Sequence, residues 1–351
     1  MATRRILLLG TGGIATHHVQ EFADLPNVKI VACVDSVPGR ADAFAARYHI
    51  AEAFPSLEAA IAWGDFEAAI NCTPDAVHKP TTLALIAAGK HVFCEKPLAP
   101  NYPDAMEMTE AAEKAGLVNM VNLTYRNSPA VQEARAMVQA GEIGELRHVE
   151  AAYRQSWLVS KAWGDWRTDE KWLWRLSKAH GSTGVLGDVG VHILDFATYA
   201  AGDKIVTVKA DLATFRKAEG DRIGDYRLDA NDSFAMTGRM ASGALATIVA
   251  TRYATGHMND LALALHGTKG SLKLETDGRK SKLWGCLGND VEKFRWRKLE
   301  LPQVKRNARR FADALASGVN GGLSFRRAAE MQQIIDAAFA SDKSGKEIKL
   351  A

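Results

Sequence analysis

The chain has 351 residues, 47% of them hydrophobic, which is enough for about two domains with sizeable cores. Its 44 Lys and Arg residues nearly balance 41 Asp and Glu residues, and the net charge of +3 gives no indication of nucleic-acid binding. No apolar stretch approaches the roughly 18 residues of a membrane span, and the four cysteines form no CxxC pair, so we expect a soluble cytoplasmic protein with reduced thiols.

An apolar β-type run before residue 10 leads through a glycine-rich turn into a predicted helix. The turn has the pattern G-x-G-x-x-A, formed by Gly10, Gly12 and Ala15. The first glycine permits a sharp turn, the second lets the backbone approach a pyrophosphate, and the small third residue lets helix and strand pack closely. The helix N-terminus then faces the phosphate charge. The two histidines on this helix, His17 and His18, are expected to be solvated.

A second apolar segment, residues 28–35, ends in a carboxylate. Asp35 follows Ala15 by 20 residues, where a carboxylate accepts hydrogen bonds from an adenosine ribose. A glycine turn alone often serves only as a turn, but the two features at this spacing predict a dinucleotide site. The charge of Asp35 repels the extra phosphate of NADP and favours NAD, although Arg40 nearby leaves NADP possible.

Strand and helix patterns continue to alternate, which predicts a parallel sheet with helices on both faces. Residues that follow the strands of such a sheet converge on one crevice at the carboxyl ends. Lys96, in a Glu-Lys-Pro turn, follows one of these strands. Most such charged pairs are only solvated, but an ammonium here can bind a substrate hydroxyl and stabilise the oxyanion left by its proton. The expected cofactor-binding residues are Gly10, Gly12, Gly13, Ile14, Asp35, Arg40, Thr73, Pro74, His78, Glu95 and Asn122.

From about residue 125 the pattern changes to alternating β segments with short hairpin links, and helices are predicted at 304–318 and 325–341. We therefore predict a dinucleotide-binding domain of Rossmann type over 1–124. An α+β domain for substrate binding and oligomerisation is predicted over 125–351. Its sheet is expected to be mainly antiparallel.

The stretch GDVGVHILD at 187–195 sets Asp188, His192 and Asp195 close to one face of a predicted helix. A metal site needs a further ligand, and His180 belongs to no recognisable ligand spacing, so no metal is expected. A structural interpretation has Asp188 capping the helix and His192 hydrogen-bonded in the core. Beside a nicotinamide, an acid–base pair is the stronger interpretation, because imidazole titrates near neutral pH. Asp195 is expected to serve structure.

Five of the eight tryptophans lie between residues 157 and 174, in a segment of irregular pattern. Large aromatic residues mostly pack in cores. We hypothesise that Trp163 or Trp166 nevertheless places its indole face against a sugar ring, with Arg167 and Asp165 binding hydroxyls. Arg126 is equally compatible with a substrate anion and with a salt bridge.

The glycine loop, TPDAVH at 73–78, EKP at 95–97 and GDVGVHILD together resemble the glucose–fructose oxidoreductase, inositol dehydrogenase and MocA (Gfo/Idh/MocA) family. The resemblance covers nearly the whole chain. In that family the lysine of E-K-P and the Asp and His of D-x-x-x-H form the catalytic group, which implies Lys96, Asp188 and His192 here. The resemblance also implies a C-terminal domain with a large open β-sheet, often used for dimer or tetramer assembly.

These features predict an NAD(P)-dependent dehydrogenase of a sugar or cyclitol. Lys96 and His192 would handle the proton, Asp188 would orient the reacting group, and hydride would pass to the nicotinamide. One alternative is an NAD-dependent glycoside hydrolase that uses a transient oxidation. Another is a non-catalytic dinucleotide sensor, which could dispense with Lys96 or His192. The expected substrate-binding residues are Lys96, Arg126, Trp163, Trp166, Arg167, Asp188 and His192.

Overall fold

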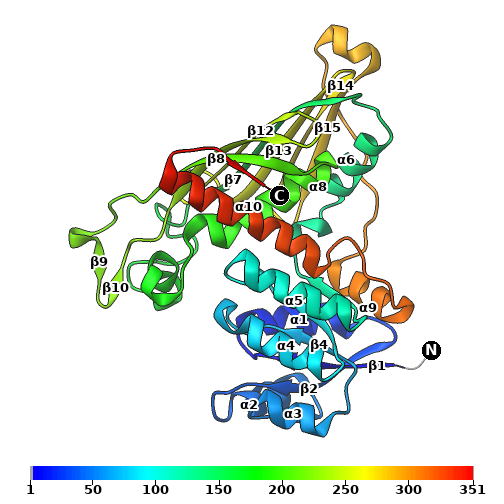
Figure 1. The fold of residues 1–351 in the computed structure, drawn as a ribbon, viewed down its shortest axis with the longest axis vertical. Coiled ribbons are helices and arrows are strands. Elements are labelled where there is room, and N and C mark those ends of the chain that lie inside the picture. Colours follow the sequence, from blue (N-terminus) through cyan, green and yellow to red (C-terminus); the bar gives the residue numbers. More distant parts are fainter. Residues whose placement is uncertain (1–2, 351) are drawn as a thin grey trace. The chain divides into compact units, whose positions relative to one another are not determined.

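The computed structural model describes residues 3–350, which pack as two compact units (Figure 1). Unit 1 extends to Leu123 and also contains Lys305–Gln332. Unit 2 contains Thr124–Val304 and the chain from Gln333 onward, so helix α10 (Phe325–Ser344) contributes to both units. None of the helices in the described residues has the length and apolar character needed to span a membrane.

Unit 1 is built on six parallel strands in the order β3-β2-β1-β4-β5-β6. The inner strands are buried almost throughout, as expected for a parallel sheet between helices. The predicted Rossmann-type α/β fold is thereby confirmed. The elements of this unit are β1 (Arg4–Leu9), α1 (Gly13–Ala23), β2 (Val28–Val34), α2 (Arg40–Tyr48), β3 (Glu52–Phe54), α3 (Leu57–Trp63), β4 (Ala68–Asn71), α4 (His78–Ala87), β5 (His91–Cys94), α5 (Tyr102–Lys114), β6 (Asn119–Val121) and α9 (Asn307–Ser317).

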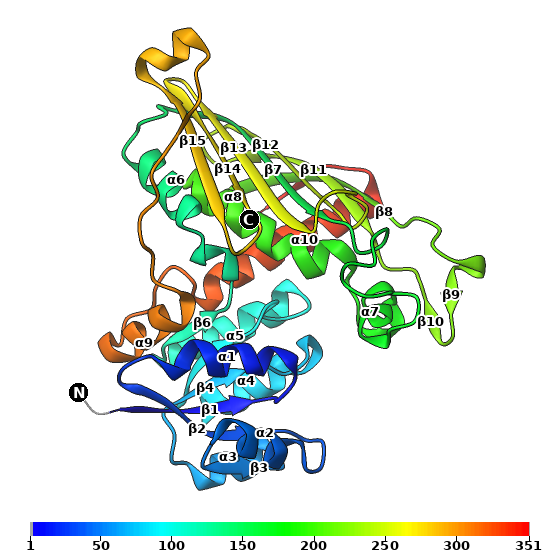
Figure 2. The ribbon, with the colours of Figure 1, turned by 180° about the vertical axis from the view of Figure 1, so that it is seen from behind.

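Helix α9 packs beside α1 in unit 1, although the two helices are far apart in the sequence (Figure 2). The ring of Phe311 on α9 stacks on Phe93 of β5, with 5.1 Å between the ring centroids. The amide of Asn307, at the start of α9, donates to the side-chain oxygen of Asn122 at 3.1 Å. A segment late in the chain therefore completes the core behind the ends of β5 and β6.

Unit 2 is built on a nine-stranded sheet in the order β16-β15-β14-β13-β7-β12-β11-β8-β17. Only β7 and β12 pair in parallel among these strands, so the predicted mainly antiparallel sheet is confirmed. Its elements are α6 (Pro129–Gln139), β7 (Leu146–Gln155), α7 (Glu170–Leu173), α8 (Val191–Ala201), β8 (Ile205–Ala213), β9 (Arg222–Ile223), β10 (Tyr226–Arg227), β11 (Ser233–Met240), β12 (Leu245–Thr251), β13 (Asn259–Gly267), β14 (Gly270–Thr276), β15 (Ser281–Leu287), β16 (Arg297–Lys298) and β17 (Ile348–Lys349).

The two faces of this sheet differ in burial. Helices α6 and α8 pack on one face, and both views show them on the same side of the strands (Figures 1 and 2). Leu261, Leu263 and Leu265 of β13 are buried on that face. The intervening residues along β12, β13 and β14 are partly or fully exposed. This period-two alternation leaves the opposite face open in the single chain.

Candidate active site

The loop after β1 has the geometry of a phosphate-binding turn. Gly10 has a φ of +86°, and a Cβ there would lie 2.9 Å from the backbone of Cys72, so the turn requires glycine. Gly12 is the N-cap of α1 and provides no side-chain cap, while Cβ atoms at Gly12 and Gly13 would meet no atom within 4 Å. Ile14 is exposed on the same turn. The first N–H groups of α1 are therefore accessible to a phosphate, which fits a dinucleotide.

Asp35 follows β2 and is held by the same loop. Its carboxylate accepts hydrogen bonds from the backbone N–H and hydroxyl of Thr11, at 3.0 and 2.7 Å, and from the N–H of Val37 at 2.9 Å. Nη1 of Arg40 lies 3.4 Å from Oδ1. Burial alone would raise the pKa of Asp35, but these hydrogen bonds and Arg40 outweigh it and lower the pKa. An ionised, oriented carboxylate at this point suits ribose hydroxyl donors and disfavours a 2′-phosphate.

Glu95 is buried in a polar network at the end of β5. Its Oε1 lies 2.7 Å from Nε2 of His18 and accepts a hydrogen bond from the amide of Asn122 at 2.8 Å. Burial would raise the pKa of Glu95, but His18 and Asn122 lower it to about 2. The expectation that His18 is solvated was wrong, because its ring is fully buried against this carboxylate. The network joins α1, β5 and β6 directly beside Lys96.

His78 braces the turn that carries Lys96. Its ring is buried, with Nδ1 2.8 Å from the carbonyl oxygen of Pro97 and Nε2 2.8 Å from that of Thr73. Both partners are acceptors, so both ring nitrogens must donate, and the imidazole is cationic. Burial on its own lowers the pKa of His78, but Cys94 and the other groups around the ring raise it to about 9. The ring thus links the turn of Thr73 and Pro74 to the Lys96–Pro97 turn.

In unit 2, Asp188 lies in a π-helical turn, Leu186–Gly190, that leads into α8. The turn requires Gly187, because a Cβ there would lie 1.7 Å from the side chain of Thr183. The predicted regular α-helix is therefore correct only from Val191. A π-helical turn has a wider repeat than an α-helix, and such turns occur often at functional sites.

His192 is buried on the first turn of α8. Its ring meets the ring of Tyr125 edge to face, with 5.2 Å between the centroids. The hydroxyls of Tyr125 and Tyr153 share a hydrogen bond of 2.7 Å. Burial raises the pKa of Tyr125 to about 12, so the phenol beside the imidazole is neutral near pH 7. This packing fixes the plane of the imidazole.

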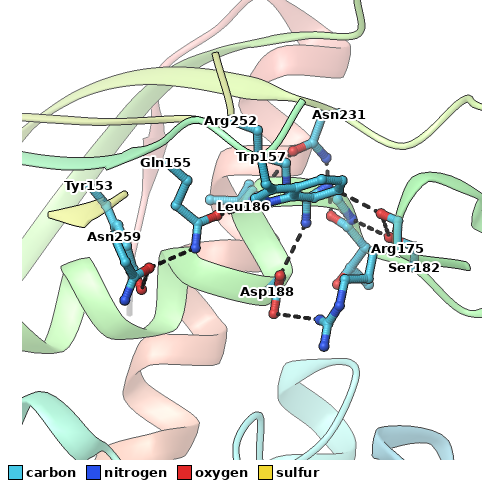
Figure 3. A network of polar contacts seen from close by, with 12 residues as sticks. Tyr153, Gln155, Trp157, Arg175, Ser182, Leu186, Asp188, Asn231, Arg252 and Asn259 are labelled. Carbon is cyan, nitrogen blue, oxygen red and sulfur yellow. Dashed lines mark hydrogen bonds and ion pairs between the residues drawn. The ribbon is translucent and has the colours of Figure 1, made fainter. Parts of the chain in front are cut away.

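Asp188 lies between two guanidinium groups (Figure 3). Nη1 of Arg175 is 3.3 Å from Oδ1, and Nη2 of Arg252 is 3.1 Å from Oδ2. Arg252 follows β12, is fully buried, and has its guanidinium 4.8 Å from the ring centroid of Trp157. Two positive charges stabilise the ionised carboxylate, which can then accept a hydrogen bond from a substrate hydroxyl.

Comparison with known proteins assigns both units to one family. Residues 4–123 match the model of the GFO/IDH/MocA oxidoreductase family, NAD-binding Rossmann fold, and residues 131–273 match that of the GFO/IDH/MocA C-terminal domain. The chain belongs to the Gfo/Idh/MocA oxidoreductase family. The predicted family, its NAD cofactor and the oxidoreductase class are thereby confirmed.

This oxidoreductase has relatives of similar length. A levoglucosan dehydrogenase from Pseudarthrobacter phenanthrenivorans is 31% identical over 314 residues, covering 83% of this chain and 78% of that protein. The inositol 2-dehydrogenase of Rhizobium meliloti is 29% identical over 275 residues, covering 78% and 76%. A solved structure of levoglucosan dehydrogenase with NADH and levoglucosan superimposes with a TM-score of 0.86 at 25% identity, covering 99% of both chains.

The tryptophan-rich segment of the oxidoreductase is largely core. Trp166 is buried, and its indole N–H donates to the carbonyl of Leu158 at 3.1 Å. The guanidinium of Arg167 lies 4.5 Å from the ring centroid of Trp166. Trp163 is partly exposed and meets Trp172 edge to face at 5.9 Å. The indole of Trp166 is therefore occupied by packing, and stacking on a sugar ring stays a prediction for Trp163.

Arg126 forms a buried salt bridge. Its Nε and Nη2 donate to the two carboxylate oxygens of Asp195 at 2.6 and 2.7 Å, and the side chains are 4% and 3% exposed. The guanidinium also lies 3.3 Å from the ring centroid of Tyr199. Of the two interpretations of Arg126, the structure shows the salt bridge. Asp195 has the structural role that its position suggested.

A row of polar residues near the Asp188 turn was missed by sequence reasoning. Tyr153, Gln155 and Trp157 follow one another at every second position on and after β7 (Figure 3). Oδ1 of Asn259 accepts hydrogen bonds from Tyr153 at 2.8 Å and Gln155 at 2.9 Å. The period-two spacing could have placed these three residues on one face. No spacing pattern in the sequence indicated that Arg175 and Arg252 would lie beside Asp188.

Proposed function

We propose that this oxidoreductase is an NAD-dependent dehydrogenase that oxidises a hydroxyl of a sugar or cyclitol. The observation that supports it most is the arrangement at the start of α8, where a buried imidazole on the helix follows a carboxylate held between two guanidinium groups in the preceding π-helical turn. The relatives named levoglucosan dehydrogenase and inositol 2-dehydrogenase support the substrate class. The presence of Lys96, Asp188 and His192 together favours an enzyme over a dinucleotide sensor.

In this proposal bound NAD supplies the hydride acceptor. A ring nitrogen of His192 accepts the proton of the reacting hydroxyl, since imidazole has a pKa suited to general-base catalysis near pH 7. Nζ of Lys96 donates a hydrogen bond to the same oxygen and stabilises its developing negative charge. Asp188 accepts a hydrogen bond from a neighbouring substrate hydroxyl and thereby orients the ring.

A substrate screen tests this function. Purified protein is incubated with NAD or with NADP and a panel of free sugars, inositols and sugar acids, and the near-ultraviolet absorbance of the reduced cofactor is followed. We expect reduction of NAD by at least one member, and slower reduction of NADP because the Asp35 carboxylate opposes a 2′-phosphate. Glycoside cleavage without net reduction would instead indicate the hydrolase. Dinucleotide binding without turnover of any compound would indicate the sensor.

We also propose a cytoplasmic location. Among the described residues Cys33, Cys72, Cys94 and Cys286 are all free thiols, and the first three are buried. Burial and neighbouring carboxylates raise the pKa of Cys33 to about 11. Free thiols without disulfide partners suit a reducing compartment.

The open face of the nine-stranded sheet supports the proposal that two copies of the chain pair there. Its centre is small and apolar, with Val249 of β12 and Ala262 of β13 both opposite Ala152 of β7. Charged side chains such as Glu150 and Lys273 adjoin it, and together these residues line a hollow of about 580 Å³. An apolar centre with a polar rim is typical of protein–protein interfaces.

Ala262→Arg is expected to convert the assembly to a lower oligomeric state, because it buries an unpaired charge at the centre of the interface. The molar mass is measured by size-exclusion chromatography with light scattering. Ala115→Arg, which adds the same charge at an exposed site in unit 1, is the matched control and should keep the native mass. A monomeric native protein, or an Ala262→Arg variant of unchanged mass, would contradict pairing through this face.

A further inference from the structure

The side chains around Asp188 carry more positive than negative charge. Arg175 and Arg252 share this one carboxylate, approaching it from different sides (Figure 3). Asp232 also acts on Arg252, but it is already paired with Lys217 at 2.6 Å. The ion pairs of this cluster therefore leave one guanidinium charge without a carboxylate of its own.

The uncompensated charge is accessible at Arg175. Arg252 is fully buried, and its Nη1 donates to the backbone carbonyl of Arg175 at 3.2 Å. The side chain of Arg175 is 31% exposed and that of Asp188 is 24% exposed. A charge in contact with solvent attracts a ligand anion, whereas the charge of Arg252 can act only through its neighbours. Arg175 is thus the point at which an anion can reach the cluster.

The same cluster has more hydrogen-bond donors than acceptors. Within this cluster, four buried N–H groups have no acceptor among the described residues, namely Nε of Arg175, Nε of Arg252, Nε1 of Trp163 and Nε1 of Trp172, whereas one buried acceptor, Oδ1 of Asp232, has no donor. These side chains are neighbours, since Trp172 contacts both Trp163, at 5.9 Å between centroids, and the guanidinium of Arg175, at 5.8 Å from its ring. Unsatisfied buried donors are costly, so an environment with an excess of donors favours acceptor oxygens over further donors at the exposed part of Arg175.

Aromatic packing holds the Arg175 guanidinium in place for recognition. Its central carbon lies 4.6 Å from the ring centroid of Trp174, and Trp172 flanks it as well. An indole face stabilises a guanidinium cation and restricts its plane. A planar guanidinium fixed in this way loses little entropy when it forms two parallel hydrogen bonds to a carboxylate.

We propose that Arg175 binds the carboxylate of the substrate, and that the substrate is a sugar acid, such as a uronic or aldonic acid, rather than a neutral sugar. The inference rests on the proposed dehydrogenase function and narrows its substrate class. A single uncompensated positive charge matches the one negative charge of a carboxylate. A phosphate carries about 1.5 to 2 negative charges near pH 7, so it matches less well.

The test compares three ligands that differ only at C6, namely D-glucose, D-glucuronate and D-glucose 6-phosphate. Their affinities for the protein saturated with NADH are measured by isothermal titration calorimetry, and NADH formation from each with NAD is measured separately. We expect glucuronate to bind about 10- to 100-fold more tightly than glucose, since hydrogen bonds to charged groups have roughly that effect. The preference should shrink as the salt concentration rises.

Arg175→Gln removes the positive charge. Arg175→Lys keeps the positive charge but removes the bidentate hydrogen-bond geometry of the guanidinium. Arg175→Gln is expected to weaken glucuronate binding at least about tenfold more than it weakens glucose binding, because both sugars lose the support that Arg175 gives Asp188 but only the acid loses its own partner. Arg175→Lys should recover part of the preference. Arg147→Gln, at an exposed arginine on β7, is the matched control and should bind all three ligands as the native protein does. Thermal melts establish that each variant is folded.

The outcomes separate the substrate class from the function. Equal affinity of the native protein for glucose and glucuronate overturns the assignment to Arg175, as does an equal loss for both in Arg175→Gln. Tighter binding of glucose 6-phosphate than of glucuronate overturns the choice of carboxylate. Binding of glucuronate with no NADH formed from any compound contradicts the dehydrogenase function alone. NADH formation from neutral sugars without binding of acids contradicts the sugar-acid proposal alone.

Discussion

His192→Ala is expected to lower kcat by about 10²- to 10⁴-fold, the range typical of the loss of a general base. The variant removes the imidazole on α8 that would accept the hydroxyl proton, while Tyr125 and the Asp188 cluster stay in place. Lys96→Ala is expected to have an effect of similar direction, because the developing oxyanion loses its hydrogen bond. The kcat of each variant is measured from steady-state NADH formation with the substrate identified in the screen.

NADH affinity separates a chemical defect from a damaged fold. The glycine loop and Asp35 belong to unit 1, so the His192→Ala variant should bind NADH as tightly as the native protein. Binding is measured from the change in NADH fluorescence on titration with protein. His257→Ala and Lys114→Ala, at partly exposed and exposed positions respectively, are the matched controls and should keep native turnover. Native turnover in His192→Ala or in Lys96→Ala would remove that residue from the proposed mechanism.

Arg126→Ala and Asp195→Ala are each expected to lower the free energy of unfolding by about 3–5 kcal/mol, because each leaves an uncompensated buried charge. The pair makes two hydrogen bonds and lies almost entirely out of solvent. The loss of unfolding free energy is measured by urea denaturation monitored by circular dichroism. The double variant Arg126→Met/Asp195→Leu should lose less stability than the two single variants lose in sum, because it removes both charges together.

An exposed pair provides the contrast. Arg147 and Glu145 are 2.6 Å apart but well exposed, and Arg147→Ala should cause no measurable change in unfolding. If Arg126→Ala were as harmless as Arg147→Ala, the buried pair would not support the segment beside Tyr125 and His192. If the double variant lost as much as the two single variants combined, uncompensated charge would not be the cause.

The local geometry that agrees best with prediction is that encoded in short stretches of sequence. The proposed roles of Gly10, Gly12 and Asp35 follow from one turn and one strand end, and the structure has a tight turn at Gly10 and a hydrogen bond from Thr11 to Asp35. The roles proposed for Asp188 and His192 also rest on one stretch, although the π-helical turn was not predicted. A π-helical turn depends on a close contact between Gly187 and a neighbouring side chain, which periodicity does not reveal.

The errors concern charged and aromatic side chains whose partners are distant in the sequence. His18 meets Glu95 across 77 positions, and Arg126 meets Asp195 across 69. Buried charges must find a partner, but no local pattern says which residue it will be. For this reason the solvated position predicted for His18 was wrong, and the partner of Arg126 could not be predicted.

Motif spacing and periodicity were enough to predict the family, the α/β class of the first unit, the NAD cofactor and the mainly antiparallel open sheet of the second. Periodicity and motif spacing involve residues that are close together in the sequence, so they can be recognised without knowing the tertiary structure. The tertiary structure alone decided that α9 completes the core of unit 1 and that Arg175 and Arg252 share Asp188. The partners in these contacts come from separate segments, and only the packing of the core brings their charges close enough to require pairing.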